Sequence, residues 1–334
     1  MTIRQKSSML SRRAIIKAFL ICPIVSKAAA QSQKRRVAWV TSKTSIADAS
    51  RTEPFRAALR AKGWIEEGNI DILWAFAGDK NDDIDAVIRE VIAQRADVIV
   101  AETAGIIVKL KQLKYESAIV SLSAGSLEGV DLIDSINRPG RNVTGSQMLS
   151  TDLIYKRAEL IRELLPSAST MVFMEPLTAA ALMQRSYVET AALAAEKYGL
   201  KFVKISVRNP DEVEELYKRL SIDASQVVLV PSNPLTVNNA KKIVKSSNNY
   251  RVLSIYEVAL FVKVGGLISY GPNRDKFPLI AADYVDRILK GVPPSDLPIY
   301  QSSDYEMVLN LNTARDIGIQ ISHNILARAA EIIE

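Results

Sequence analysis

The sequence predicts an α/β fold with two doubly wound lobes, each built on a parallel sheet. From Arg36 onward, short apolar runs rich in β-branched residues alternate with longer amphipathic stretches. Strands that are apolar along their whole length are typical of parallel sheets covered by helices on both faces. The series begins again after residue 150, and 334 residues is about twice the length of a typical domain. One lobe is therefore expected before this point and one after it.

The first half contains four runs with the pattern of buried or half-buried strands. Helices are expected between them, because Gly63 follows one amphipathic stretch as a stop signal. Asp82 and Asp83 stand where carboxylates favour the start of another helix. The expected strands are Val37–Thr41, Ile70–Trp74, Asp97–Ala101 and Ala118–Leu122, and the expected helices are 52–62, 82–94 and 104–114.

The second half repeats this order of elements. Residues 209–212, Asn-Pro-Asp-Glu, combine an N-cap, a proline at the first helical position and acidic residues in the first turn. Gly199 and Gly291 end two other helical stretches, and Gly265-Gly266 interrupts the pattern before a further strand. The expected strands are 171–174, 202–207, 227–230, 252–255 and 267–270, and the expected helices include 151–165, 178–198 and about 276–290.

The net charge of +6 suggests binding to nucleic acid, but the whole surplus lies in the first 30 residues. That segment has six basic residues and no acidic one, which leaves 37 basic and 37 acidic residues in 31–334. A segment that is formally neutral gives no electrostatic reason to expect nucleic acid as a partner. The six basic residues are Arg4, Lys6, Arg12, Arg13, Lys17 and Lys27.

Residues 1–30 have the order of an export signal: a basic start, an apolar run and small residues before a cleavage point. The apolar run, 18–25, is far shorter than the roughly 20 residues that span a bilayer. Paired arginines in 11–17 resemble a twin-arginine signal, and an ordinary secretory signal fits nearly as well. Cys22 is a weaker candidate for lipid attachment, because a bulky residue precedes it. Cleavage after Ala30 is favoured.

Recognisable motifs of catalysis and cofactor binding are missing from the sequence. The chain has one histidine, His323, near its C-terminus, which gives no credible Ser–His–Asp set. Its one cysteine, Cys22, excludes a disulfide framework and a Cys-based zinc site. No Gly-x-Gly-x-x-Gly follows a strand, and no Gly-x-Ser-x-Gly occurs. We therefore expect a protein that is not an enzyme and uses neither a cofactor nor a metal.

Six loops at the carboxyl ends of expected strands carry hydroxyl, amide and carboxylate groups. Open α/β sheets bind ligands at this edge, so the loops suit a small polar solute held between two lobes. For any single Ser, Thr or Asn, a role as a helix cap is an equally good interpretation. The convergence of several such loops favours a ligand site. The loops are 41–44, 102–104, 121–125, 175–176, 231–234 and 256–257.

Three sequence blocks resemble the bacterial ABC-transporter substrate-binding proteins, the family that includes tryptophan/tyrosine-type binding proteins. The blocks are RPGRNVTG at 138–145, GGLISYGPN at 265–273, and a tail formed by 284–298 and 309–314. The likeness covers essentially all of 36–334. It implies a type I periplasmic-binding-protein fold, in which a hinge of three crossings joins the two lobes.

The resemblance also implies where one lobe ends and the other begins. Its crossings would lie near Thr144-Gly145, near Ser269-Tyr270 and after Leu297-Pro298. The first lobe would contain 36–145 and about 270–298, and the second would contain 146–269 and about 299–334, after an export signal at 1–30.

Seven residues of the six loops are the candidate ligand contacts. Hydroxyl and backbone N–H groups would hold a carboxylate, and Glu175 would pair with an amino group of the ligand. The loops depart from the family pattern: Thr103-Ala104 stands where members often have Thr-Pro or Ser-Pro, and Asn233-Pro234 stands where Asp-Pro is expected. An aromatic amino acid as ligand is therefore not carried over. The candidates are Ser42, Thr103 and Ser123 in the first lobe and Glu175, Ser232, Asn233 and Tyr256 in the second.

These features predict an exported, periplasmic solute-binding protein of an ABC importer. It would capture a small polar solute, an amino acid or a related carboxylate, by hinge closure between the lobes. Its expected partners are this small molecule, a membrane permease and the permease's ATPase, and a monomer is expected that meets the membrane only through the permease. The alternative is a sensory protein of the same fold that feeds a signalling receptor.

Overall fold

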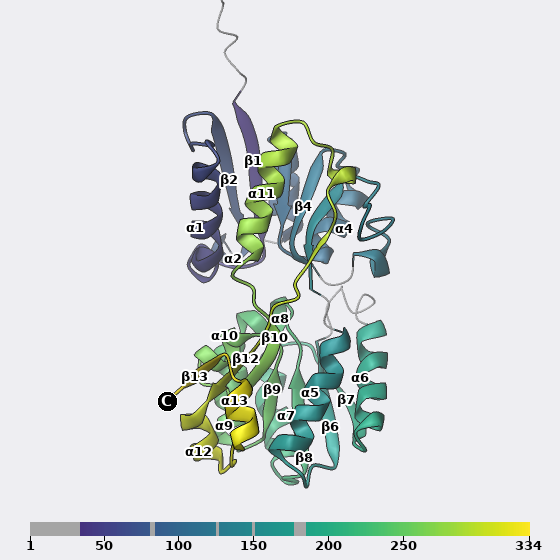
Figure 1. Cartoon of the computed structure of the whole chain (residues 1–334), viewed down its shortest axis with the longest axis vertical. Helices are drawn as coiled ribbons and strands as arrows, with labels where there is room; N and C mark the ends of the chain where they lie inside the picture. Colours follow the sequence, from purple (N-terminus) through teal and green to yellow (C-terminus); the bar gives the residue numbers. More distant parts are fainter. Residues whose placement is uncertain (1–33, 81–83, 125–126, 149–150, 177–184) are drawn as a thin grey trace, which may run out of the picture. The chain divides into compact units, whose positions relative to one another are not determined.

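Two β-sheets form the framework of the protein (Figure 1). The computed structural model describes residues 34–80, 84–124, 127–148, 151–176 and 185–334. The first sheet has six strands in the order β11-β5-β4-β3-β1-β2, all parallel. Its strands are β1 (Arg35–Thr41), β2 (Ile70–Phe76), β3 (Val98–Ala101), β4 (Ala118–Ala124), β5 (Val143–Gln147) and β11 (Tyr300–Gln301).

The second sheet has seven strands in the order β13-β12-β10-β9-β8-β6-β7. Its neighbours are parallel except for one antiparallel pair, β10 with β12. The predicted fold class, two parallel-sheet α/β lobes, is confirmed. The strands are β6 (Thr170–Pro176), β7 (Lys201–Val207), β8 (Gln226–Val230), β9 (Ser254–Tyr256), β10 (Ile268–Pro272), β12 (Tyr305–Asn310) and β13 (Glu331–Ile333).

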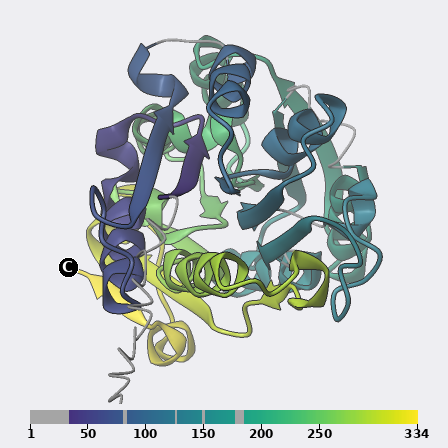
Figure 2. The same ribbon diagram turned by 90° about the horizontal axis from the view of Figure 1, so that it is seen from above.

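Helices cover both faces of each sheet. On the first sheet, alternate residues of β1 enter two different cores: Val37 and Trp39 pack with α1 and α11, and Ala38 and Val40 pack with α3 and α4. Figure 2 shows the yellow-green α11 beside the purple α1. These helices are α1 (Ser45–Ala61), α2 (Ala77–Lys80), α3 (Ile84–Ala93), α4 (Ala104–Gln112) and α11 (Phe277–Leu289).

The second sheet alternates in the same way. In β6, Met171 and Phe173 face the core under α5, α6, α12 and α13, whereas Val172 and Met174 face the core under α7, α9 and α10. A strand with apolar residues on both faces is buried on both, as the sequence pattern predicts. The helices are α5 (Thr151–Leu164), α6 (Arg185–Lys197), α7 (Asp211–Leu220), α8 (Pro234–Asn238), α9 (Ala240–Asn249), α10 (Ala259–Lys263), α12 (Leu311–Ile317) and α13 (His323–Arg328).

The chain passes between the two sheets after β5, after β10 and after β11. Ser146 and Gln147 still pair with β11 in the first sheet, and β10 pairs with β12 as far as Pro272 in the second. Each crossing therefore lies a few residues later than the resemblance implies. The reason is that β11 and β12, two strands that the sequence pattern does not reveal, extend the pairing of β5 and β10.

Gly145 in β5 occupies a position that only glycine fits. Its φ of +113° lies in a region that residues with a Cβ rarely adopt. A Cβ there would also lie 2.3 Å from the carbonyl oxygen of Ser121 on the neighbouring strand β4. The glycine thus lets β5 approach β4 closely just before the first crossing.

One helix begins earlier than predicted. It starts at Ser45 rather than at residue 52, so Pro54 lies inside it and not in its first turn. The turns before residue 52 are anchored to the sheet through Asp48. This carboxylate is fully buried, and its Oδ2 accepts a hydrogen bond of 2.7 Å from Trp39 Nε1 of β1. The predicted helix starts at 82–83 and 178–184 lie outside the described residues. Among the residues that are described, no helix combines the length and the apolar character needed to cross a membrane.

Replacing Asn310 with alanine is expected to lower the free energy of unfolding by about 1 kcal/mol. Asn310 is the N-cap of α12, and its Oδ1 accepts a hydrogen bond of 3.0 Å from the backbone N–H of Thr313. Urea unfolding measures the change. Asn312→Ala is the control, because Asn312 lies inside the same helix and alanine has the higher helix propensity. Equal losses in the two variants would contradict the capping role.

Candidate functional site

The carboxyl ends of β1 and β3 bring two of the expected loops together in the first lobe. Glu102, the residue after β3, is 5% exposed, and its Oε2 accepts hydrogen bonds from the Thr41 hydroxyl at 2.7 Å and from both N and Oγ of Ser42 at 3.1 Å. Its Oε1 accepts from Arg51 Nη2 at 2.9 Å. A buried carboxylate with charge-assisted partners of this kind is strongly held. The first lobe therefore holds a fixed, paired carboxylate where β1 and β3 end.

Two cations set the ionisation of Glu102. Burial by itself raises the pKa of its carboxyl, but the charges of Arg51 and Lys43, with the hydrogen bond from Thr41, outweigh burial and lower the pKa to about 2. The Lys43 Nζ lies 3.4 Å from Glu102 Oε1. Burial and the nearby Arg51 lower the pKa of Lys43 to about 8, although Glu102 opposes this change.

Arg274 stands on the second crossing, between β10 and α11. Burial, and then repulsion by Arg51, lower the pKa of its guanidinium to about 10. Three carboxylates oppose the change by attraction, namely Glu102 and Asp48 of the first lobe and Glu257 of the second. A cation on a crossing segment thus interacts with acidic groups of both lobes.

The second lobe has its own buried ion pair at the corresponding edge. Arg157 of α5 is fully buried, and its Nη1 lies 3.2 Å from Oε1 of Glu257, the residue after β9. Arg157 also donates to Tyr187 Oη at 2.9 Å and to the carbonyl of Tyr270 at 2.8 Å. Glu257 Oε2 accepts from the backbone N–H of Ser232 at 2.6 Å. Burial raises the pKa of Glu257, against the attraction of Arg157.

Close approach of the backbone shapes this corner of the second lobe. A Cβ on Gly271 would lie 1.8 Å from the carbonyl oxygen of Glu257 and 3.7 Å from Arg157 Nη2. Because Gly271 of β10 has no side chain, the Arg157 guanidinium and the Glu257 backbone can lie next to the start of the second crossing. The ion pair is therefore positioned at the hinge end of the sheet.

Glu175, the candidate partner for a ligand amino group, already has a cation. Its Oε1 accepts from Lys204 Nζ at 3.0 Å and its Oε2 from Ser206 Oγ at 2.7 Å, both on the edge strand β7. The carboxylate is 8% exposed. Any ligand ammonium would have to compete with Lys204 for it.

The remaining candidates fall into three groups. Ser42 and Ser232 contact the two buried glutamates, as described above. Thr103 and Asn233 are N-caps of α4 and α8, accepting from the backbone N–H groups three residues later. Tyr256 is fully buried and stacks on Phe261 at 4.8 Å between ring centroids, so its side chain packs in the core and does not reach the ligand edge. The side chain of Ser123 lies outside the described part of the chain.

Sequence analysis missed the charged residues that organise this edge. Glu102 and Glu257 lie inside two of the expected loops. Each is a carboxylate directly after a buried strand, and this position is the sequence signal that could have identified them. Arg51 and Arg157 lie in helices, and Arg274 on a crossing; their partners are far away in the sequence, so no local pattern identifies them.

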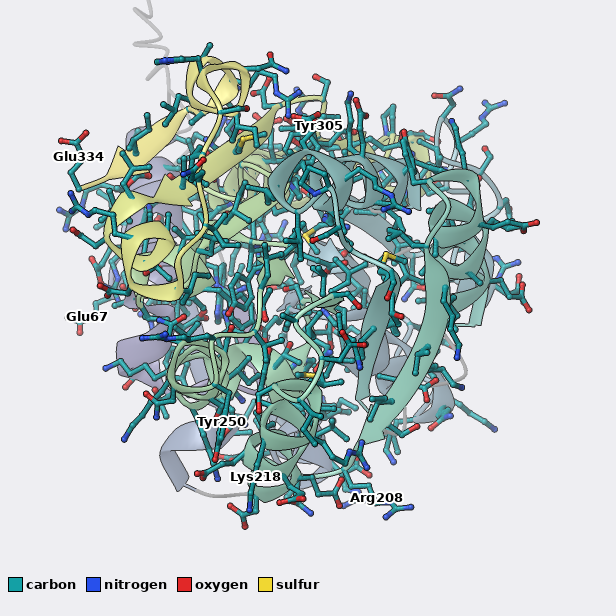
Figure 3. All side chains as sticks on the ribbon, turned by 90° about the horizontal axis from the view of Figure 1, so that it is seen from below. Glu67, Arg208, Lys218, Tyr250, Tyr305 and Glu334 are labelled. Carbon is teal, nitrogen blue, oxygen red and sulfur yellow. The ribbon has the colours of Figure 1, made fainter. Side chains whose placement is uncertain are left out.

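Charge is otherwise distributed over the outside of the molecule. Arg208 and Lys218, for example, are exposed on the second lobe and point away from it (Figure 3). In the part of the chain that the structure describes, no group of three or more His, Cys, Asp or Glu side chains could hold a metal ion. The buried ionic clusters at the strand ends are therefore the candidate site.

A groove elsewhere on the first lobe has a different character. It has a volume of about 340 Å³ and is lined by the edge strand β2 and by α3, with Glu90 as its one charged residue. Its lining includes none of the buried ion pairs. We place the candidate site at the strand ends because specific recognition of a polar solute needs converging polar groups.

Comparisons with known proteins agree with this architecture. The family described as "ABC transporter substrate binding protein" matches residues 44–333. The chain is 22% identical over 267 residues to a "Tyrosine-binding protein" of Clostridioides difficile (strain R20291), covering 80% of this chain and 76% of the relative. A conserved domain protein of Vibrio cholerae superposes with a TM-score of 0.80 at 22% identity, covering 90% of this chain and all of the other.

An ABC domain from Streptococcus pneumonia in complex with L-Trp gives a TM-score of 0.79 at 18% identity, again covering 90% of this chain and 100% of the other. At this level of identity the two superpositions establish the fold, a type I periplasmic-binding-protein architecture, and the family match establishes kinship. The chain therefore belongs to the ABC transporter substrate-binding protein family, whose members bind substrates and are not enzymes.

Proposed function

We propose that this chain is an exported solute-binding protein of an ABC importer, which captures a small polar solute carrying a carboxylate between its two lobes. One observation carries the proposal: each lobe has a buried ionic cluster at the carboxyl ends of its strands, and Arg274 on a crossing interacts with acids of both. Ligands of open α/β sheets bind at that edge.

The ionic clusters give the ligand edge a fixed geometry before the solute arrives. Glu102 immobilises Ser42 in the first lobe, and Glu257 immobilises the backbone of Ser232 in the second. A solute that contacts both loops stabilises the closed arrangement, and it shifts the equilibrium only by its differential affinity for that arrangement. Motion at the three crossings would then bring the two edges together.

The relatives support the class of solute. A C. difficile relative is named for tyrosine, and the S. pneumonia structure holds L-Trp. Both compounds carry a carboxylate, which suits a site rich in N–H and O–H donors. A membrane permease and its ATPase would receive the solute, export would follow from residues 1–30, and a monomer would suffice, since the two lobes of one chain form the site.

A ligand of this class is expected to add about 2.7 kcal/mol to the free energy of unfolding when present at 100 times its dissociation constant. Thermal unfolding of the full chain against amino acids, carboxylates, nucleosides and sugars measures the effect. Ser232→Ala should reduce the gain, because Ser232 lies in a ligand-edge loop. Ser221→Ala is the control, since Ser221 ends α7 on the outside and should leave the gain unchanged.

Small-angle scattering provides the second readout. A stabilising ligand should also reduce the radius of gyration, because the proposal requires hinge closure. Failure of every compound to stabilise the protein, or stabilisation without compaction, would contradict it.

A further inference from the structure

We propose that the site selects an organic acid recognised as an anion, a carboxylate without an α-ammonium group, in preference to a zwitterionic amino acid. This inference rests on the proposed function and narrows its solute class. It follows from which polar groups at the strand ends are already paired and which are not.

Three buried side chains at the ligand edge have an N–H group without an acceptor among the described residues. They are Arg51, Arg157 and Asn233, with 8%, 0% and 8% exposure, and the unpartnered atoms are Nη1, Nη2 and Nδ2 respectively. The orientation of the Asn233 amide is fixed, because its Oδ1 accepts from the backbone N–H of Thr236 at 3.1 Å. A buried donor without an acceptor is costly, so a ligand that supplies acceptors to these groups would gain from binding here.

The three side chains belong to the ligand edge by their other contacts. Arg51 shares Glu102 with Ser42, and Arg157 shares Glu257 with Ser232. Asn233 is the neighbour of Ser232 in the loop that follows β8. The guanidinium and amide groups in question can donate but not accept, so the complementary ligand is rich in acceptors.

The carboxylates of the same edge, in contrast to these donors, are all paired within the protein. Glu102 is paired with Arg51 and Lys43, Glu257 with Arg157, Glu175 with Lys204, and Asp48 with Arg51. An α-ammonium group needs a carboxylate that is not already neutralised, and every one of these four has a protein cation. The described residues of this edge thus offer donors to an anion and no unpaired acid to a cation.

The balance of charge at this edge also favours an anionic ligand. The four carboxylates above pair with four cations, and the charge of a fifth cation, Arg274, acts on three of the same acids, so these nine groups have one positive charge in excess. A monoanion neutralises that excess, whereas a zwitterion does not. The five cations are Lys43, Arg51, Arg157, Lys204 and Arg274.

Lys43 provides a second, independent readout. Burial and the cations Arg51 and Arg274 lower its pKa to about 8, while Glu102 and Asp48 oppose the change. A bound anion favours the charged ammonium and raises this pKa, so the protein takes up protons when the ligand binds near pH 8. By the same linkage, affinity for an anion should fall as the pH rises through 8.

The direct test compares acids that share a carbon skeleton and differ only at the α position. Alanine, phenylalanine, tyrosine and glutamate are each compared with the matching 2-hydroxy and 2-oxo acids by thermal unfolding and titration calorimetry of the full chain, with neutral sugars alongside. We expect at least one hydroxy or oxo acid to bind ten-fold or more tightly than its amino acid. Equal or tighter binding of the amino acids, or binding of a sugar alone, overturns this inference and leaves the proposed function standing. Binding of no compound overturns both.

Calorimetry at pH 8 in buffers of different ionisation enthalpy measures the proton uptake. Lys43→Arg keeps the positive charge but does not titrate at this pH, so the acid that it binds should bind without proton uptake, whatever the change in affinity. Lys218→Arg, at an exposed position on the second lobe, is the matched control and should keep both the affinity and the uptake. Binding of the acid without proton uptake in the wild-type chain overturns the anion assignment at Lys43.

Discussion

Replacing Glu102 with glutamine is expected to lower the free energy of unfolding by about 3 to 5 kcal/mol. Glutamine keeps the size of the side chain and removes its charge, which leaves Arg51 and Lys43 buried beside a neutral amide. The N–H and Oγ of Ser42 now donate to the carboxylate. In the variant some of these donors would face the amide N–H₂ group, which cannot accept a hydrogen bond. Urea unfolding measures the loss.

The same variant should change how stability depends on pH. Against the effect of burial, the charges of Arg51 and Lys43, with the hydrogen bonds, hold the pKa of Glu102 at about 2, below its ordinary value of 4.5. The stabilisation is complete above pH 4.5 and is lost as the pH falls towards 2, which amounts to roughly 3 kcal/mol. Glu102→Gln should remove this part of the acid sensitivity.

Glu116→Gln is the matched control for both measurements. Glu116 is exposed just before β4, so the same loss of one carboxylate should have little effect there. If Glu102→Gln and Glu116→Gln unfold at the same urea concentration, or if the acid dependence of Glu102→Gln matches that of the wild-type chain, the network around Glu102 does not stabilise the fold.

Sequence reasoning found the fold because the fold is encoded locally. Continuous apolar strands such as Val98–Ala101 and helix signals such as the one at 209–212 depend on neighbouring residues only. The strands β11 and β13, with two and three residues, are too short to leave such a pattern. They are strands because β11 pairs with β5 and β13 pairs with β12, and these pairings exist only in the folded chain.

Sequence pattern alone does not show which of two neighbouring residues at a strand end faces the candidate site. Successive side chains of a strand point to opposite faces, and near the end of β9 this separates Tyr256, which enters the core, from Glu257, which lies at the ligand edge. The sequence predicted a ligand contact for Tyr256, whereas in the structure the Tyr256 ring packs on Phe261 and the buried carboxylate at the strand end is that of Glu257. The ion pair of Glu257 with Arg157 spans 100 residues of sequence, and no periodicity or motif reports a contact at that distance.

Replacing Arg157 with methionine is expected to cost about 3 to 5 kcal/mol of unfolding free energy. Methionine fills most of the volume, so the loss comes from the charge and its hydrogen bonds. Glu257 would be left as a buried carboxylate without its cation, and the carbonyl of Tyr270 and the hydroxyl of Tyr187 would lose a donor. The control is Arg328→Met, where the ion pair with Glu163 is partly exposed and about 1 kcal/mol or less is expected.

A double-mutant cycle separates the charge from the packing. Adding Glu257→Gln to Arg157→Met removes the stranded charge, so the double variant should be more stable than the sum of the single losses predicts, by about 1 to 3 kcal/mol. The Ser232 N–H would still find an acceptor in the amide oxygen of the glutamine. Strictly additive losses would mean that Arg157 stabilises the second lobe through its volume and its bonds to Tyr187 and Tyr270. In that case the ion pair would serve to orient the ligand edge without stabilising the fold.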